Sequence, residues 1–216
     1  MVEAWSSSDG MSPIPLGRDL AAVLPIGIPM GLVSSEKDKE RRFLVRRSGS
    51  YCLLDREGQE LWSFAWHGLS REQLAFSLAQ RWVRRTPQVL ADIDEFVSRR
   101  MLLGLGGDWR EDWERLDTIR AVPRGICRGK DERNSFKLIT PDLRFEIVVS
   151  GIDFALWSTW DGCTTLGQAV GSVGEFTGAS VSVLRRHSHA LLVACVRAGA
   201  IFIDDLVIPT AGEENG

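Results

Sequence analysis

The sequence predicts an α+β fold made of two similar units in tandem, each a small antiparallel sheet followed by three helices. Short apolar runs typical of strands precede segments whose apolar residues recur every three or four positions, as in amphipathic helices. The same order of strands and helices then occurs again, with a tryptophan motif at the corresponding place in both copies. These observations favour a duplicated unit of about 65 residues.

The composition is that of a globular protein that buries a core. Of the 216 residues, 44% are hydrophobic and 25% are charged. The formal charge of -3 and the pI of about 5.7 make nucleic acid an unlikely partner, because binding to phosphate backbones requires a basic surface. Cys52, Cys127, Cys163 and Cys195 lie far apart, which favours reduced thiols and a cytoplasmic location over disulfides or structural zinc.

Residues 1–40 are predicted to lie outside the first unit. Residues 1–19 are rich in Ser, Gly, Asp and Pro, as in a tail. The apolar segment 20–33 is shorter than the roughly 20 residues of a membrane span and contains Pro25 and Pro29. We therefore expect neither a signal peptide nor membrane association, but an extended segment or edge strand that lies against the first unit.

The first unit is predicted over residues 41–105. Residues 43–45 and 51–54 have the apolar character of two hairpin strands around a Ser-Gly-Ser turn. From Leu61 the apolar residues recur at helical spacing, and Gly68 is expected to end that helix. The unit thus begins with two strands and a helix.

Two further helices complete this unit. Ser70 and Gln73 form a capping-box pattern that begins the second helix. Pro87 lies in the first turn of the third helix, where its missing N–H costs nothing. The apolar spacing continues to Met101, so we expect this helix to end at Gly104.

The second unit is predicted over residues 136–205, followed by a tail at 206–216. It repeats the order of the first unit: strands over 136–139 and 145–149, a helix ended by Gly162, a helix capped by Thr165 and Gln168, a helix capped by Ser180 and ended by Gly199, and a strand over 200–203. The shared motif is Leu61-Trp62-Ser63 followed by Trp66 and Gly68 in one copy, and Leu156-Trp157-Ser158 followed by Trp160 and Gly162 in the other.

Residues 106–135 are predicted to connect the two units. Asp108 can cap a short helix in which Trp109, Trp113 and Leu116 share one face. Such a stripe either packs against one of the units or docks a partner protein, because tryptophan is favoured as a binding anchor.

No motif in the sequence indicates catalysis. The glycines at 104–107 follow a helix and lack the Lys-Ser/Thr of a phosphate loop. His187 and His189 lie two positions apart on a predicted helix and therefore point to different sides, which does not suit a shared metal. No histidine lies near Cys52 or Cys163 in the sequence. We expect a non-catalytic protein without metal or cofactor.

The order of these elements resembles PqqD and the wider family of precursor-peptide recognition elements, which serve the biosynthesis of ribosomally made, modified peptides. In the first copy the resemblance rests on the strands at 43–45 and 51–55, Leu61-Trp62, His67-Gly68, and the helices at 70–78 and 93–103. In the second copy it rests on Trp160-Asp161-Gly162-Cys163-Thr164-Thr165-Leu166. The resemblance implies two winged-helix-like units.

The resemblance further implies a protein that binds the leader of a precursor peptide and presents the remainder to a separate modifying enzyme. In this family the peptide adds as a strand to the sheet and packs against the third helix. The residues expected to bind it are Tyr51, Cys52, Leu53 and Leu54 at the sheet edge and Ile93, Phe96, Val97 and Arg100 on the helix. Arg100 can pair with an acidic leader residue.

Three interpretations remain open at this stage. A chain with two such units is similar in outline to partner subunits of iron-dependent oxidases in these pathways, which makes such an oxidase a candidate partner. A winged-helix unit also occurs in DNA-binding regulators, and the predicted third helix of the second unit is basic, with Arg185, Arg186 and Arg197. The chain can also be a structural adaptor in an enzyme complex.

Overall fold

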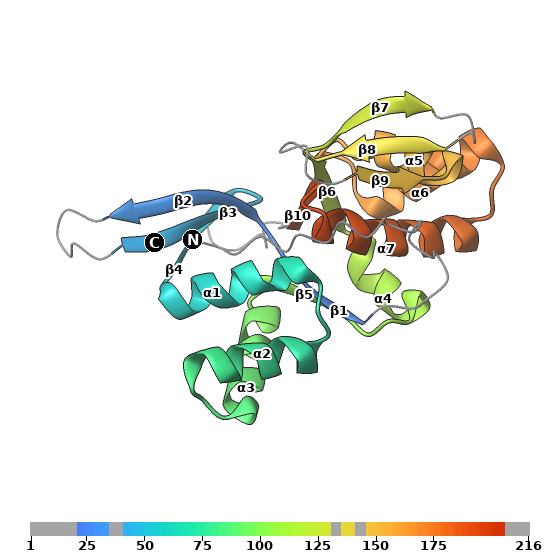
Figure 1. Cartoon of the computed structure of the whole chain (residues 1–216). Coiled ribbons are helices and arrows are strands. Elements are labelled where there is room, and N and C mark those ends of the chain that lie inside the picture. Colours follow the sequence, from blue (N-terminus) through green and yellow to red (C-terminus); the bar gives the residue numbers. More distant parts are fainter. Residues whose placement is uncertain (1–20, 35–40, 131–134, 141–145, 206–216) are drawn as a thin grey trace, which may run out of the picture.

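The computed structural model of the chain describes residues 21–34, 41–130, 135–140 and 146–205. The predicted tails at 1–19 and 206–216 lie outside the described residues. The fold is α+β with small antiparallel sheets, as the sequence predicts. Figure 1 shows a projecting three-stranded sheet, a helical part beneath it and a second mixed part beside them.

The element order divides into two parallel sets around one helix. The first set is β1 (Ala22–Pro25), β2 (Ile28–Ser34), β3 (Arg41–Arg47), β4 (Ser50–Leu54), α1 (Arg56–Phe64), the 3-10 turn η1 (Ala65–His67), α2 (Arg71–Trp82), α3 (Thr86–Ser98) and β5 (Leu102–Leu105). Helix α4 (Trp109–Leu116) follows. The second set is β6 (Ile119–Pro123), β7 (Ile126–Lys130), β8 (Phe136–Ile139), β9 (Glu146–Val149), α5 (Gly151–Thr159), α6 (Leu166–Thr177), α7 (Val181–Arg197) and β10 (Ile201–Asp205).

The described strands form the same pair of sheets in each set. A three-stranded sheet, β2-β3-β4 or β7-β8-β9, precedes the helices. A two-stranded ribbon then joins the first strand of the set to the last, β1 to β5 and β6 to β10. We call β1 to β5 with their helices the first unit, and β6 to β10 with theirs the second unit.

The predicted unit boundaries at residues 41 and 136 are therefore wrong. Strands β1 and β2 lie in the apolar segment that begins at residue 20, which the sequence predicts as an extended segment or edge strand outside the first unit, and β6 and β7 lie within the predicted connector. The sequence holds a signal for this: Pro-x-Gly-Ile-x-x-Gly occurs at Pro25–Gly31 and again at Pro123–Gly129. In both copies the last glycine has a positive φ, 102° and 101°, beside an irregularity in the ladder.

Local signals set most helix boundaries where the sequence predicts them. Ser70 and Thr165 each accept a hydrogen bond from the backbone N–H three residues later, and both capping boxes are complete. The third helix of the first unit is an exception, because it ends at Ser98 rather than at Gly104. Arg100 turns the chain with a φ of 55°, and residues 102–105 form β5.

The β1–β5 ribbon lies between two hydrophobic cores. Successive residues of a strand face opposite sides. The ribbon contributes Ala22, Leu24, Leu103 and Leu105 to the core that is built mainly from the second unit, and Val23 and Leu102 to the core of the first unit. Both faces of the ribbon are buried, so the two units share one continuous interior.

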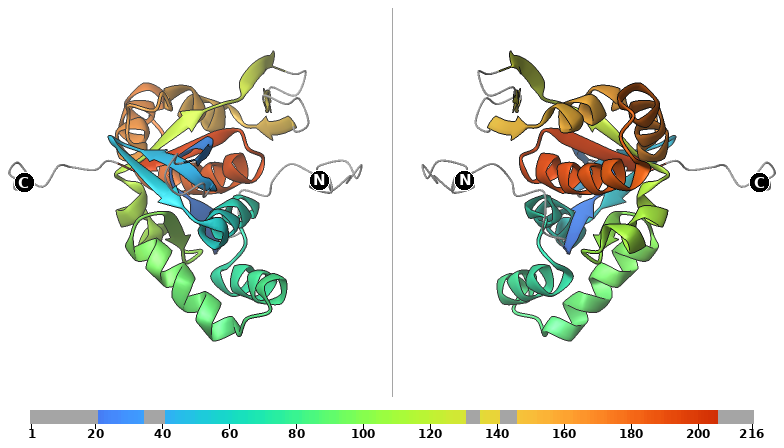
Figure 2. Two further views of the ribbon diagram at one scale, coloured as in Figure 1. Left: turned by 90° about the vertical axis from the view of Figure 1, so that its left-hand side faces the viewer. Right: turned by 90° about the vertical axis from the view of Figure 1, so that its right-hand side faces the viewer.

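Further contacts join the units on either side of this ribbon. The Gly27 N–H donates to the Ile203 carbonyl of β10 at 2.7 Å. Trp66 packs edge-on against Phe202, with ring centroids 5.6 Å apart. The side views of Figure 2 place α2 and α3 at one end of the molecule and the β7–β9 sheet at the other, with β10 and α7 between them.

Candidate functional site

The β2-β3-β4 sheet of the first unit has two outer strands, and only one carries features that discourage pairing. Strand β2 contains Pro29 and an irregularity between Pro29 and Gly31, both typical of protected edges. Strand β4, Ser-Tyr-Cys-Leu-Leu, has no proline, glycine or charged residue. Among the described strands β4 pairs with β3 alone. Within the described ranges, the open side of β4, which we call the β4 edge, is therefore an unprotected strand edge.

The register of the hairpin identifies the backbone groups at this edge. Ser48 and Gly49 form the turn, so Arg47 and Ser50 are the hydrogen-bonded pair that closes it. Hydrogen-bonded and non-hydrogen-bonded pairs alternate along an antiparallel ladder. Tyr51 and Leu53 consequently direct their N–H and C=O groups away from β3. Their side chains are exposed by 64% and 52%.

Cys52 and Leu54 face the other side of the hairpin, toward the core. Leu54 is only 6% exposed, and Cys52 is half-buried against the same core. Ile93 on α3 is fully buried in that core. The sequence places Leu54 and Ile93 among the peptide-binding residues. This is wrong for both, because neither side chain presents surface to a ligand.

The C-terminal half of α3 runs beside β4. A Cβ built on Gly58 would lie 3.1 Å from Phe96 Cζ and 3.5 Å from Leu54 Cβ, so the Phe96 ring lies close to the end of β4. At the other end of β4, Arg47 Nη1 donates to the Arg99 carbonyl at 2.9 Å. Phe96 and Val97 are half-buried. The structure thus places Phe96 and Val97 on the core side of the hairpin, near Cys52 and Leu54, whereas the side chains of Tyr51 and Leu53 point to the opposite, exposed side.

Arg100 lies where α3 turns into β5, and its backbone is strained. A φ of 55° is unfavourable for a residue with a Cβ. The corresponding turn of the second unit, after α7, has Gly199 with a φ of 68°. The Arg100 side chain is 67% exposed, and its Nη1 lies 4.0 Å from Asp205. The exposed Arg100 side chain is therefore a candidate for contact with a ligand.

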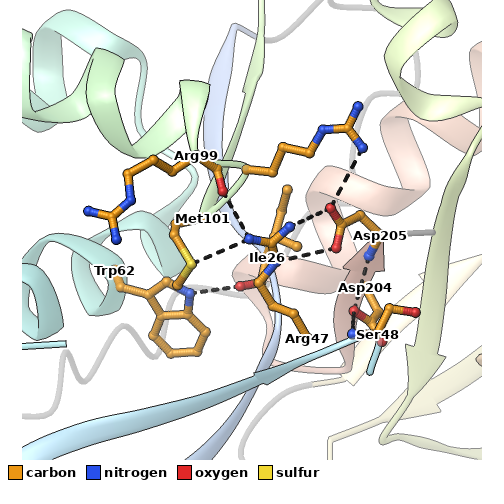
Figure 3. A network of polar contacts seen from close by, with 9 residues as sticks. Ile26, Arg47, Ser48, Trp62, Arg99, Met101, Asp204 and Asp205 are labelled. Atoms are coloured by element: carbon orange, nitrogen blue, oxygen red, sulfur yellow. Dashed lines mark hydrogen bonds and ion pairs between the residues drawn. The ribbon is translucent and has the colours of Figure 1, made fainter. Parts of the chain in front are cut away.

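A buried polar cluster, centred on Arg47, joins the hairpin turn to β10 of the second unit (Figure 3). Arg47 Nε and Nη2 donate to the two carboxylate oxygens of Asp205 at 3.3 and 2.7 Å. The Ser48 N–H donates to Asp204 Oδ1 at 2.9 Å. The side chains of Arg47 and Asp205 are only 9% and 4% exposed. Nothing in the sequence pattern indicates this pairing, because the two residues are 158 positions apart.

The sheet that carries the β4 edge is basic. Its three strands hold Arg41, Arg42, Arg46 and Arg47 and no acidic residue. Of these side chains, Arg47 is paired with Asp205, and Arg46 is exposed. The local charge favours an acidic ligand, although the whole chain is slightly acidic.

No protein-family model, curated protein or solved structure matches this chain. The geometry of its own residues therefore carries the functional argument.

The predicted docking helix α4 turns its apolar face into the molecule and exposes its charged face. Asp108 caps it as predicted, but Trp113 and Leu116 are 5% and 0% exposed within the larger core. The Arg185 guanidinium of α7 lies 5.2 Å from the Trp113 ring. Trp109 alone keeps partial exposure, with the Arg110 guanidinium 4.7 Å from its ring. Trp113 and Leu116 are thus core residues rather than a partner-docking surface.

The histidines of α7 bind separate carboxylates. His187 Nδ1 lies 2.7 Å from Asp153, and His189 Nε2 lies 3.0 Å from Asp112. The described part of the chain contains no group of three or more His, Cys, Asp or Glu side chains placed to hold a metal. Burial raises the pKa of the Cys195 thiol, which keeps it protonated and unreactive. Within the described residues no helix has the length and apolarity to cross a membrane.

Proposed function

We propose that this chain is a peptide-binding protein whose first unit, a winged-helix-like element, takes up an extended peptide as a fourth strand beside β4. In line with the family resemblance, the peptide is the leader of a ribosomally made precursor. The protein presents the rest of that precursor to a separate modifying enzyme and does no chemistry itself. An iron-dependent oxidase is the candidate enzyme.

The observation that carries this proposal is the unprotected β4 edge. Proteins normally shield such an edge with charge, proline or a bulge, because it templates pairing with any extended chain. Strand β2 of the same sheet has such protection and β4 has none. The outward N–H and C=O groups of Tyr51 and Leu53 provide up to four backbone hydrogen bonds for a guest strand, at about 3.4 Å per residue.

Side chains beside the edge provide selectivity. Alternate residues of an added strand face α3, where Phe96 and Val97 offer apolar contact. Arg46 and Arg100 supply exposed positive charge at the turn end of β4. The surface thus suits a peptide of β-branched or aromatic residues with an acidic residue near one end.

The burial of α7 argues against a DNA-binding regulator. Ten residues of this helix, which is the more basic of the two third helices, are buried against the rest of the chain. A recognition helix needs a free face to enter the major groove. Helix α3 is more accessible but presents Asp94 and Glu95, which repel phosphate. The adaptor alternative predicts no peptide binding and is separated by the experiment below.

The test is a titration of the full chain with fluorescein-labelled synthetic peptides that cover short reading frames next to its gene, followed by anisotropy. Leu53→Pro removes an outward-facing donor and leaves the β3–β4 ladder bonds in place, so we expect it to weaken binding at least tenfold. Val148→Pro is the matched control. Leu53 pairs with the residue that follows Phe43 in β3, and Val148 of β9 pairs with the residue that follows Phe136 in β8, so the two have the same register position.

The Leu53 and Val148 variants separate the interpretations. Binding that is lost in Leu53→Pro and kept in Val148→Pro supports strand addition at β4. Equal binding by wild type and Leu53→Pro would falsify it. The absence of binding by wild type to every such peptide favours the adaptor alternative.

A further inference from the structure

We propose that Arg47 is a positioning residue through which the second unit holds the β4 edge against α3, so that the second unit serves as a scaffold and not as a second binding site. The inference rests on the proposed function of the first unit. It follows from the buried cluster in Figure 3, which the family resemblance does not imply.

Arg47 lies at the point where the binding strand begins. It pairs with Ser50, the first residue of β4, across the hairpin turn. Its guanidinium contacts three groups: the Asp205 carboxylate, the Arg99 carbonyl at 2.9 Å and Met101 Sδ at 3.7 Å. One side chain therefore connects the start of β4, the end of α3 and the last described strand of the second unit.

The second unit contributes two consecutive residues to this connection. Asp205 binds the Arg47 guanidinium through both carboxylate oxygens, and Asp204 accepts from the Ser48 N–H in the turn. Strand β10 is itself fixed by its five-residue pairing with β6. Because planar bidentate contacts fix orientation as well as distance, the angle between the hairpin and α3 depends on β10.

In the described part of the second unit, the position that corresponds to Arg47 is not an arginine. Arg47 lies four residues after Phe43 in β3, and the residue four positions after Phe136 in β8 is Thr140. Arg100 and Gly199 occupy the same turn after the third helix of each unit, so the two helices can be aligned on them. In this alignment Phe96 and Val97 correspond to Cys195 and Val196. These two are at most 1% exposed, so α7 offers no accessible counterpart of Phe96 and Val97. Among the described residues the two copies thus differ in the helix surface beside the sheet.

The test uses Asp205→Asn in the full chain, because the amide keeps the shape and removes the charge. The matched control is Asp94→Asn, since Asp94 also forms a two-oxygen pair with an arginine, Arg71, but this pair is exposed and joins α3 to α2 rather than to the hairpin. We measure amide hydrogen exchange by NMR and the affinity for the labelled peptide that binds wild type most tightly.

We expect Asp205→Asn to speed exchange at the Cys52 and Leu54 amides, which bond within the hairpin, by about tenfold, and to weaken peptide binding by a similar factor. Asp94→Asn is expected to leave both unchanged. Unchanged exchange in β4, or an equal increase at buried Leu74 and Leu78 of α2, overturns the inference, because the pair is then neutral or a general stabiliser. If wild type binds no peptide, the proposed function fails, and exchange alone still decides whether Arg47 positions β4.

Discussion

The shared β1–β5 ribbon predicts that the two units unfold together. Leu24 is completely buried in the larger core, and its neighbour Val23 is buried in the other. Leu24→Ala removes three buried carbon atoms and leaves a cavity, which costs about 2–5 kcal/mol at such a site. This is a large part of the roughly 5–15 kcal/mol that stabilises a typical domain.

The expected result is one transition in urea, with its midpoint lowered by about 1–2 M. Amide hydrogen exchange at buried residues reports on each unit separately. Leu74 in α2 reports on the first unit, and Val170 in α6 reports on the second unit. Because both faces of the ribbon are in use, exchange at both positions should accelerate by a similar factor. Two separate transitions, with only the second unit affected by Leu24→Ala, would refute the shared interior.

Two further predictions concern single side chains. Hydrogen bonds from Trp82 Nε1 and Arg81 Nε, at 2.7 and 3.1 Å, lower the pKa of Glu60. Its ionised form therefore stabilises the fold above the ordinary glutamate range, and this contribution is lost as the pH falls through the lowered pKa. The melting temperature of Glu60→Gln should be below that of wild type at pH 7, with a gap that shrinks below about pH 4. Arg100→Gly should stabilise the fold by about 1 kcal/mol in urea unfolding, because it relieves the positive φ, and should weaken peptide binding; a loss of stability would contradict the strain argument.

Helix starts are predictable here because their signals are local. Ser70 with Gln73 and Thr165 with Gln168 satisfy backbone donors within one turn, independent of the rest of the fold. The β1 segment is a different case. Residues 22–25 are apolar throughout, because both faces are buried, so no alternation marks them as a strand. Their pairing with β5 joins segments about eighty positions apart, which local pattern does not encode.

The end of α3 and the role of α4 show a second limit of sequence patterns. The spacing of Val97 and Met101 continues a helical stripe, yet Met101 already lies beyond the turn at Arg100. The stripe of Trp113 and Leu116 predicts a helix with one apolar face, which is confirmed. A stripe alone does not say what covers it, and here it is the chain's own α7.

Duplication explains why the candidate site is partly visible in the sequence. A sequence shows that two copies exist, but exposure decides which copy remains available. Tyr51 and Leu53 are exposed in the first unit, whereas Val148, at the register position of Leu53, is half-buried. In the second copy, helix α4 packs against the third helix α7. Asp204 and Asp205 of this copy accept hydrogen bonds from Ser48 and Arg47 in the hairpin of the first copy. Under the proposed function, these contacts hold β4 at both its turn and its adjacent helix, so the strand loses less entropy when a peptide adds to it.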